Sequence, residues 1–234
     1  MSGFYIYKED FAELPDIIRR IRYCLRNNIG FSLVRVGDAE NQVLAQGSVY
    51  SEENIKQIWW AKCPDWTGIT LPNYEARDRL IISLKQADMV GVLHQSDSYE
   101  WKPLTEAVFA QYDIRPHDIC YAFINMYLPR SNDFKLLLKE FKVLLIGKLA
   151  NRFADYLKNY LGVHPAGIIN IEHYNQISQV EKEIRTMDFD IALLSAGSNA
   201  VILAPLIAGY QKAALDIGRS MDPIFWPRSI TSSD

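Results

Sequence analysis

The sequence has few cysteines and no apolar run long enough to cross a bilayer. Its three cysteines, Cys24, Cys63 and Cys120, are far apart and form no C-x-x-C pair, so neither a zinc site nor a disulfide framework is expected. The apolar run from Ala200 to Ala208 contains Pro205 and is shorter than the roughly 20 residues that span a membrane. The start, MSGFYIYKEDF, lacks the charged and apolar regions of a signal peptide. We therefore expect a cytoplasmic protein without a transmembrane segment.

A basic surplus is also missing. The chain has 25 Lys and Arg against 28 Asp and Glu, a net charge of -3, whereas nucleic-acid binders usually carry a basic patch or stripe. Nucleic acid is therefore excluded as a main partner. A small phosphorylated ligand is not excluded, because it needs only a few local cations and backbone N–H groups.

Three enzyme fingerprints are absent as well. The sequence has no G-x-x-x-x-G-K-[ST] loop, no G-x-S-x-G elbow and no G-x-G-x-x-G after a strand. These absences argue against a P-loop enzyme, an α/β-hydrolase and a dinucleotide enzyme. A methyltransferase is disfavoured too, since the first strand is not followed by that class's glycine-rich turn.

Short apolar runs alternate with amphipathic segments along the whole chain. Helices are predicted over residues 16–28, 38–46, 73–86, 134–141, 150–161, 175–187 and 199–208, and strands over 31–36, 67–71, 89–93, 119–124, 142–146, 166–171, 190–195 and 212–217. Continuous apolar strands between helices are typical of a parallel sheet covered on both faces. We predict a three-layer, Rossmann-like α/β fold with a mainly parallel sheet. Residues 1–30 form an N-terminal helical segment packed on a single domain of residues 31–234.

Ligands in such sheets bind at the carboxyl ends of the strands, which directs attention to the loop Arg35-Val36-Gly37-Asp38-Ala39-Glu40. Two carboxylates separated by one residue can share a divalent cation, which would neutralise a diphosphate. Arg35 can clamp a phosphate or orient a carboxylate, and Gly37 lets the backbone approach a ligand. The alternative is structural, with Asp38 as a helix cap and Glu40 as a first-turn acid.

Three later loops also follow predicted strands. Ser195 to Asn199 offers small residues at a helix start, where free backbone N–H groups can cradle a phosphate. Asp216 stands late in an apolar strand, where a charge must be paired, bound to a metal or exposed. His94 follows the strand over 89–93 in a polar loop and could contact a sugar or act as a base. Each loop also fits an ordinary strand-to-helix turn or a surface position.

The segment FSLVRVGDAE, residues 31–40, resembles the opening motif of the GT-D-type bacterial glycosyltransferases, which have a Rossmann-like fold and a D-x-E metal motif. The family typically shows Arg-Phe-Gly-Asp-Gly-Glu here, so this chain has Val36 and Ala39 in place of an aromatic residue and a glycine. LLSAGSNA (193–200) and AALDIG (213–218) are similar to its closing half.

The resemblance implies a hexosyltransferase-type enzyme that passes a sugar from a nucleotide-sugar, usually a UDP-sugar, to a glycan or glycoprotein acceptor. It implies Mn²⁺ or Mg²⁺ at Asp38 and Glu40, and Asp216 at the same edge as a catalytic residue. The predicted nucleotide-sugar-binding residues are Arg35, Gly37, His94, Gly197, Ser198 and Asn199. For an inverting reaction the candidate bases are His94, Asp97 and Asp216. The alternative is a catalytically degenerate nucleotide-sugar-binding or scaffold module.

Overall fold

The computed structural model describes residues 11–57, 67–93, 97 and 101–227. In this part of the chain the strands form one sheet of eight parallel strands in the order β1-β4-β3-β2-β8-β7-β5-β6. The strands are β1 (Phe11–Ala12), β2 (Phe31–Arg35), β3 (Met89–Val92), β4 (Asp118–Tyr121), β5 (Val143–Gly147), β6 (Gly167–Ile169), β7 (Ile191–Ser195) and β8 (Ala213–Asp216). The predicted three-layer α/β fold with a parallel sheet is confirmed.

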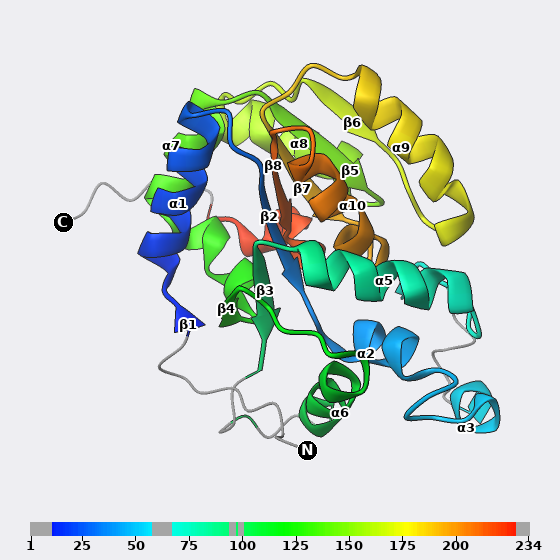
Figure 1. Ribbon diagram of the computed structural model, residues 1–234. Coiled ribbons are helices and arrows are strands. Elements are labelled where there is room, and N and C mark those ends of the chain that lie inside the picture. The colour runs from blue at the N-terminus through cyan, green and yellow to red at the C-terminus, as the bar shows by residue number, and fades with distance from the viewer. Residues whose placement is uncertain (1–10, 58–66, 94–96, 98–100, 228–234) are drawn as a thin grey trace.

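Helices cover both faces of this sheet (Figure 1). The α-helices are α1 (Leu14–Arg26), α2 (Asp38–Ala45), α3 (Glu52–Gln57), α5 (Tyr74–Gln86), α6 (Lys102–Tyr112), α7 (Asn132–Glu140), α8 (Ala150–Tyr156), α9 (Ile177–Thr186) and α10 (Asn199–Ala208). Short turns of 3-10 helix lie at Ile124–Met126, Leu128–Arg130, Tyr174–Gln176, Gly218–Met221 and Pro223–Phe225, and a π-helical turn extends α8 over Leu157–Leu161. No described helix is both long and apolar enough to cross a membrane.

Alternate side chains of each strand enter two separate cores. On β7, Ala192 and Leu194 pack with α5, α9 and α10, whereas Ile191 and Leu193 pack with α1, α7 and α8. Both sets are fully buried, which explains why the strands read as continuous apolar runs rather than alternating ones. The helix α10 is buried on almost every side, and it packs against β2, β8 and α5.

The order of the strands joins distant parts of the sequence. The early strand β2 pairs with the last strand, β8, with Phe31 opposite Ala213. β8 in turn pairs with β7, with Leu193 opposite Leu215. The loops that follow these three strands therefore leave the same edge of the sheet side by side.

One predicted strand is wrong. Residues 67–71 are not a strand, and Gly68 has a φ of +70°, which an extended strand does not allow. The backbone oxygens of this segment accept hydrogen bonds from loops instead: Thr67 from the N–H of Ser198 (3.0 Å) and Gly68 from the N–H of Tyr174 (2.7 Å). The segment thus lies across the start of α10.

Other predicted elements need smaller corrections. The strand predicted over 119–124 ends at Tyr121, and the helix α6 was not predicted. The N-terminal segment contributes the edge strand β1, which pairs with β4, as well as the predicted helix α1, whose Ile17, Ile18 and Ile21 are buried. The division into residues 1–30 and 31–234 stays a prediction.

A substitution at Gly30 tests the packing of α10 against the start of β2. A Cβ atom on Gly30 would lie 1.9 Å from the carbonyl oxygen of Ala208, so the two backbones must separate if it is present. We expect Gly30→Ala to lower the free energy of unfolding by about 2–3 kcal/mol, as measured by urea denaturation. Gly162→Ala is the control, because its Cβ would meet nothing within 4 Å and only its φ of +66° is unfavourable; about 1 kcal/mol is expected there. Equal losses for the two variants would contradict this packing.

Candidate functional site

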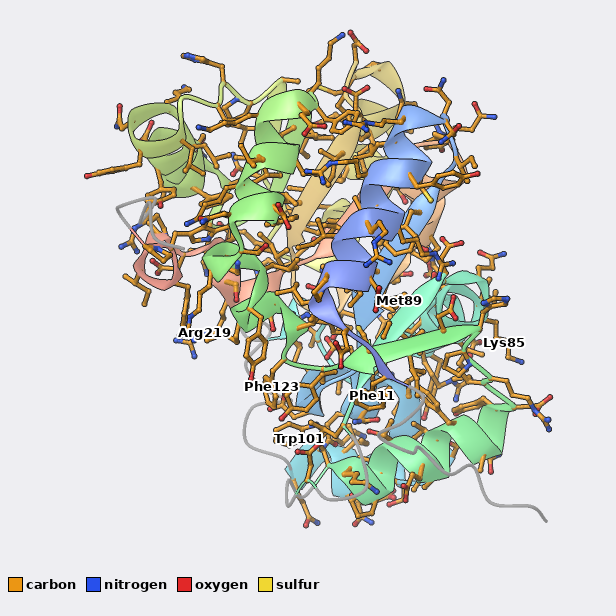
Figure 2. The ribbon with its side chains drawn as sticks, turned by 90° about the vertical axis from the view of Figure 1, so that its left-hand side faces the viewer. Phe11, Lys85, Met89, Trp101, Phe123 and Arg219 are labelled. Carbon is orange, nitrogen blue, oxygen red and sulfur yellow. The ribbon has the colours of Figure 1, made fainter. Side chains whose placement is uncertain are left out.

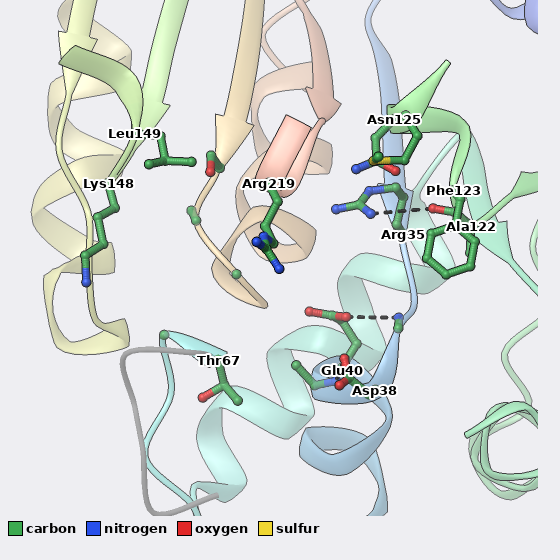
Figure 3. Close-up of a pocket in the computed structure, with 18 of the residues that line it drawn as sticks. Arg35, Asp38, Glu40, Thr67, Ala122, Phe123, Asn125, Lys148, Leu149 and Arg219 are labelled. Carbon is green, nitrogen blue, oxygen red and sulfur yellow. Dashed lines mark hydrogen bonds between the residues drawn. The ribbon is translucent and has the colours of Figure 1, made fainter. Parts of the chain in front are cut away.

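A pocket of about 910 Å³ opens at the carboxyl edge of the sheet. It is bounded by the loops that follow β2, β4, β5, β6, β7 and β8 (Figure 3). The residues from the D-x-E loop that line it are Arg35, Gly37, Asp38, Ala39 and Glu40. The early and late motifs, which are far apart in the sequence, therefore face one cavity.

Glu40 joins the two motifs directly. Its Oε2 atom accepts a hydrogen bond from the backbone N–H of Gly37 (2.9 Å), and its Oε1 atom accepts one from the hydroxyl of Ser198 (2.8 Å). The first bond belongs to the first turn of α2, where an acid three residues into the helix can reach back to the preceding N–H. The second crosses to the start of α10. The Ser198 side chain, itself fully buried, thereby positions this carboxylate.

Burial raises the pKa of the Glu40 carboxyl, and the negative charge of Asp216 adds to the shift. The hydrogen bonds from Ser198 and Gly37 and the charge of Arg35 act in the opposite direction. Because burial disfavours the ionised form, the pocket holds a carboxylate that would gain from a nearby cation.

Asp38 differs from Glu40 in being exposed. Its Oδ1 atom accepts the N–H of Ala39 at 2.9 Å, as expected for an acid in the first turn of a helix. Both departures from the family motif fit their surroundings. Ala39 lies in α2 and is not among the residues with positive φ, so its Cβ causes no backbone strain. Val36 is fully buried in the core.

The Arg35 side chain links the end of β2 to the end of β8 and to the backbone that follows β4. Its Nε and Nη2 atoms donate to the backbone oxygen and Oδ1 of Asp216, both at 3.0 Å, and Nη1 donates to the oxygen of Ala122 at 3.5 Å. Gly218 has a φ of +46° and donates its N–H to Asp216 Oδ1 at 3.0 Å. A Cβ atom on Gly218 would lie 2.2 Å from Arg35 Nη2, so a larger residue does not fit here. Burial raises the pKa of Asp216, and the Arg35 guanidinium opposes this shift.

The start of α10 does not present the free backbone donors that we expected. The N–H of Ser198 donates to Thr67, that of Asn199 to Ala196, and that of Ala200 to Gly197. The backbone oxygen of Thr67 thus accepts a donor that we had assigned to a phosphate. The Asn199 side chain is fully buried and donates to the oxygen of Gly68 at 3.2 Å.

Positive charge in the pocket comes instead from Lys148 and Arg219. Lys148 follows β5 and Arg219 follows β8; both side chains are exposed and line the pocket. Figure 3 shows Arg219 near the middle of the cavity, with Lys148 on the side opposite Arg35. Among the described residues, neither cation has a hydrogen-bond or ion-pair partner on its side chain. From the sequence, Lys148 can be interpreted as a phosphate contact or as a solvated cation at a helix start, whereas Arg219 has no assigned role.

The remaining wall is largely apolar, and it contains one more acid. Trp101, Phe123, Met126 and Phe225 line the pocket, and Figure 2 shows Arg219, Phe123 and Trp101 along the same side of the molecule. The additional acid is Glu172, which follows β6 and is exposed. It follows the strand predicted over 166–171, but no sequence motif singled it out.

The structure brings together some of the predicted site residues and separates others. Arg35, Gly37, Asp38, Glu40 and Gly197 line the pocket. Ser198 and Asp216 lie behind this lining and hold Glu40 and Arg35, while Asn199 is turned to Gly68. His94 lies outside the described residues. The chemical roles assigned to all of these residues stay predictions.

A divalent metal fits this donor set only if the protein carboxylates share it with a bound phosphorylated ligand. Within the described residues, no three His, Cys, Asp or Glu side chains are grouped so that they could hold a metal ion by themselves. Asp38 is open to the pocket, and Glu40 keeps unused lone pairs on each oxygen. Mg²⁺ and similar ions are commonly bound by one or two carboxylates together with substrate phosphates, so Asp38 and Glu40 suit a cation that arrives with a phosphorylated ligand.

The raised pKa of Glu40 predicts a pH-dependent cost in stability. The folded chain binds a proton on the Glu40 carboxyl more tightly than the unfolded chain does. The contribution of this bound proton to the free energy of unfolding is therefore complete below the unfolded pKa, and it is lost as pH rises through the folded pKa. At pH 7 and without metal, we expect Glu40→Gln to raise the melting temperature by a few degrees in scanning calorimetry. The gain should shrink as pH falls toward 4.5, the ordinary value for Glu. An unchanged or lower melting temperature at pH 7 would contradict the cost assigned to this charge.

Comparisons with known proteins agree with this fold. A profile of the GT-D fold-like domain matches residues 12–224, and a comparison with curated protein sequences gave no match. One similar solved structure is described as a new glycosyltransferase (DUF1792) from Streptococcus sanguinis; it is 18% identical, with a TM-score of 0.54, over 86% of this chain and 79% of that one. Another, described as a domain of unknown function 1792 with a distinct glycosyltransferase fold, is 15% identical, with a TM-score of 0.57, over 88% and 76%. The profile covers nearly all of the chain, which therefore belongs to the GT-D-like family.

Proposed function

We propose that this protein is a glycosyltransferase that moves a sugar from a nucleotide-sugar, most suitably a UDP-sugar, to a hydroxyl of a glycan acceptor. One observation carries the proposal: Lys148 and Arg219, two cations whose side chains have no partner among the described residues, face the same pocket as the carboxylates Asp38 and Glu40. Two exposed cations and two carboxylates around one pocket suit a ligand that brings both phosphate and a metal.

A nucleoside diphosphate meets both demands. Its phosphate oxygens can accept hydrogen bonds from Lys148 and Arg219, and a Mn²⁺ or Mg²⁺ ion carried with it would be held by Asp38 and Glu40. Such an ion supplies charge stabilisation to the leaving diphosphate. Arg35 lines the pocket but is engaged with Asp216, so its role in this scheme is to support the floor of the pocket.

The apolar wall and the size of the pocket suit the rest of such a donor. Aromatic side chains such as Trp101 and Phe123 provide faces on which a base or sugar ring can pack. A volume of about 910 Å³ lies near the upper end of the range for small-molecule sites, roughly 300–1,000 Å³, and leaves room for a donor and part of an acceptor. The names of the similar structures, which refer to a glycosyltransferase and its fold, point in the same direction.

Binding of UDP tests the proposal first. We expect titration calorimetry to show binding of UDP in the presence of Mn²⁺, and Asp38→Asn to weaken it at least tenfold. Asp133→Asn is a matched control, because Asp133 is also a first-turn acid but belongs to α7, away from the pocket. It should leave binding unchanged.

No binding of UDP to folded protein, with or without Mn²⁺, would contradict the proposal. Binding without hydrolysis or transfer of UDP-sugars over an acceptor panel would favour the second candidate, a nucleotide-sugar-binding module. If Asp38→Asn binds UDP with the affinity of the wild type, Asp38 is only a first-turn acid of α2 and does not bind the metal.

Lys148 and Arg219 give an independent prediction. We expect Lys148→Ala and Arg219→Ala each to weaken UDP binding by about tenfold, because each removes a charge-assisted hydrogen bond worth about 1.5–3 kcal/mol. Uridine lacks phosphate, so its weaker binding should not change in either variant. Lys182→Ala, on the exposed side of α9, serves as the control for lost charge. Equal effects on UDP and uridine would mean that the cations do not contact phosphate.

A further inference from the structure

We propose that Glu172 is the catalytic base that accepts the proton of the acceptor hydroxyl, so that transfer proceeds with inversion at the anomeric carbon. The inference rests on the proposed glycosyltransferase function. Glu172 lies in the loop after β6, lines the pocket and has an exposed side chain. In the described part of the chain its carboxylate has no hydrogen bond or ion pair with protein.

The backbone around Glu172 is firmly anchored, although its carboxylate has no partner among the residues that the structure describes. The N–H groups of Glu172 and His173 both donate to Oε1 of Gln176, at 2.8 and 3.0 Å. The N–H of Tyr174 donates to the oxygen of Gly68 at 2.7 Å, and Ile171 is buried in the core. A base must keep its place while the acceptor changes, and this loop provides a fixed main chain beneath a free carboxylate.

Apart from Asp38, which suits the metal, the other described acids near the pocket are already engaged. Asp216 is held by Arg35 and by the N–H of Gly218, and it does not line the cavity. Both oxygens of Glu40 accept hydrogen bonds. Asp97 does not line the pocket, and its Oδ1 atom faces the hydroxyl of Tyr121 at 3.4 Å.

Glu172 is also separate from the acids that suit a metal. Asp38, Glu40 and Glu172 line one pocket, yet they do not form a three-acid cluster able to hold an ion. Asp38 and Glu40 follow β2, whereas Glu172 follows β6, four positions away in the sheet order. The acids that suit the metal thus lie on one side of the pocket, and Glu172 lies toward the other, beside the loop after β5 that carries Lys148.

A base on a different wall from the metal carboxylates is what an in-line displacement requires. The acceptor oxygen forms a bond to the anomeric carbon while the bond from that carbon to the diphosphate oxygen breaks. The electron pair of the broken bond leaves with the diphosphate, and the proton of the acceptor hydroxyl passes to a Glu172 carboxylate oxygen. Attack from the side opposite the leaving group inverts the anomeric configuration.

Replacement of Glu172 by glutamine tests the assignment, because glutamine keeps the size of the side chain and cannot accept the proton. We expect Glu172→Gln to lower kcat for sugar transfer by at least about 100-fold, within the usual contribution of a general base. The affinity for UDP with Mn²⁺ and the KM for the donor should stay within twofold. Glu172→Asp should recover part of the rate, and Glu183→Gln, a glutamate of α9 outside the pocket, should behave as wild type.

Several results would overturn the assignment. A glutamine variant with nearly full kcat would exclude a base at this position. A parallel loss of UDP affinity would make Glu172 part of the donor or metal site instead. NMR of the wild-type product showing a retained anomeric configuration would exclude the inverting step. Absence of UDP binding in the wild type would overturn the proposed function itself, which separates the two failures.

Discussion

The hydrogen bond between Glu40 and Ser198 is the contact on which the rest of the site depends. It joins the start of α2 to the start of α10, two helices that follow strands β2 and β7. Those strands are separated in the sheet only by β8, so the contact exists because a late strand inserts between them. Without that strand order, Asp38 and Glu40 would face a different neighbour, and no common cavity would form.

A second constraint acts beneath the pocket. Arg35 spans the ends of β2 and β8 and reaches the oxygen of Ala122 beyond β4. A buried ion pair of this kind gives little net stability, although the loss of one partner is costly. Its value here is geometric, because it fixes the turn at Gly218 and with it the position of Arg219 in the cavity. Asp216 thus serves the site through Arg35 rather than by contact with a ligand.

The pocket holds one carboxylate, Glu40, whose charge is costly without a ligand, together with two exposed cations. Burial raises the pKa of Glu40, while Lys148 and Arg219 face the cavity without partners in the described structure. Binding sites often accept such a cost in stability, since the ligand supplies the missing charges. A metal with a diphosphate would satisfy the carboxylates and the cations together, and the free carboxylate of Glu172 would remain for the acceptor.

The sequence alone determined the fold class and the first half of the site. Apolar strands alternating with amphipathic helices are a local property, and so is the placement of Asp38 and Glu40 just past β2. Only the tertiary structure decided which loops meet, because strand order is set by packing between segments far apart in the chain. Three outcomes depended on this: residues 67–68 closing the start of α10, Asp216 pairing with Arg35, and Glu172 reaching the pocket. Each follows from contacts over more than a hundred residues or across several strands, which local periodicity does not encode.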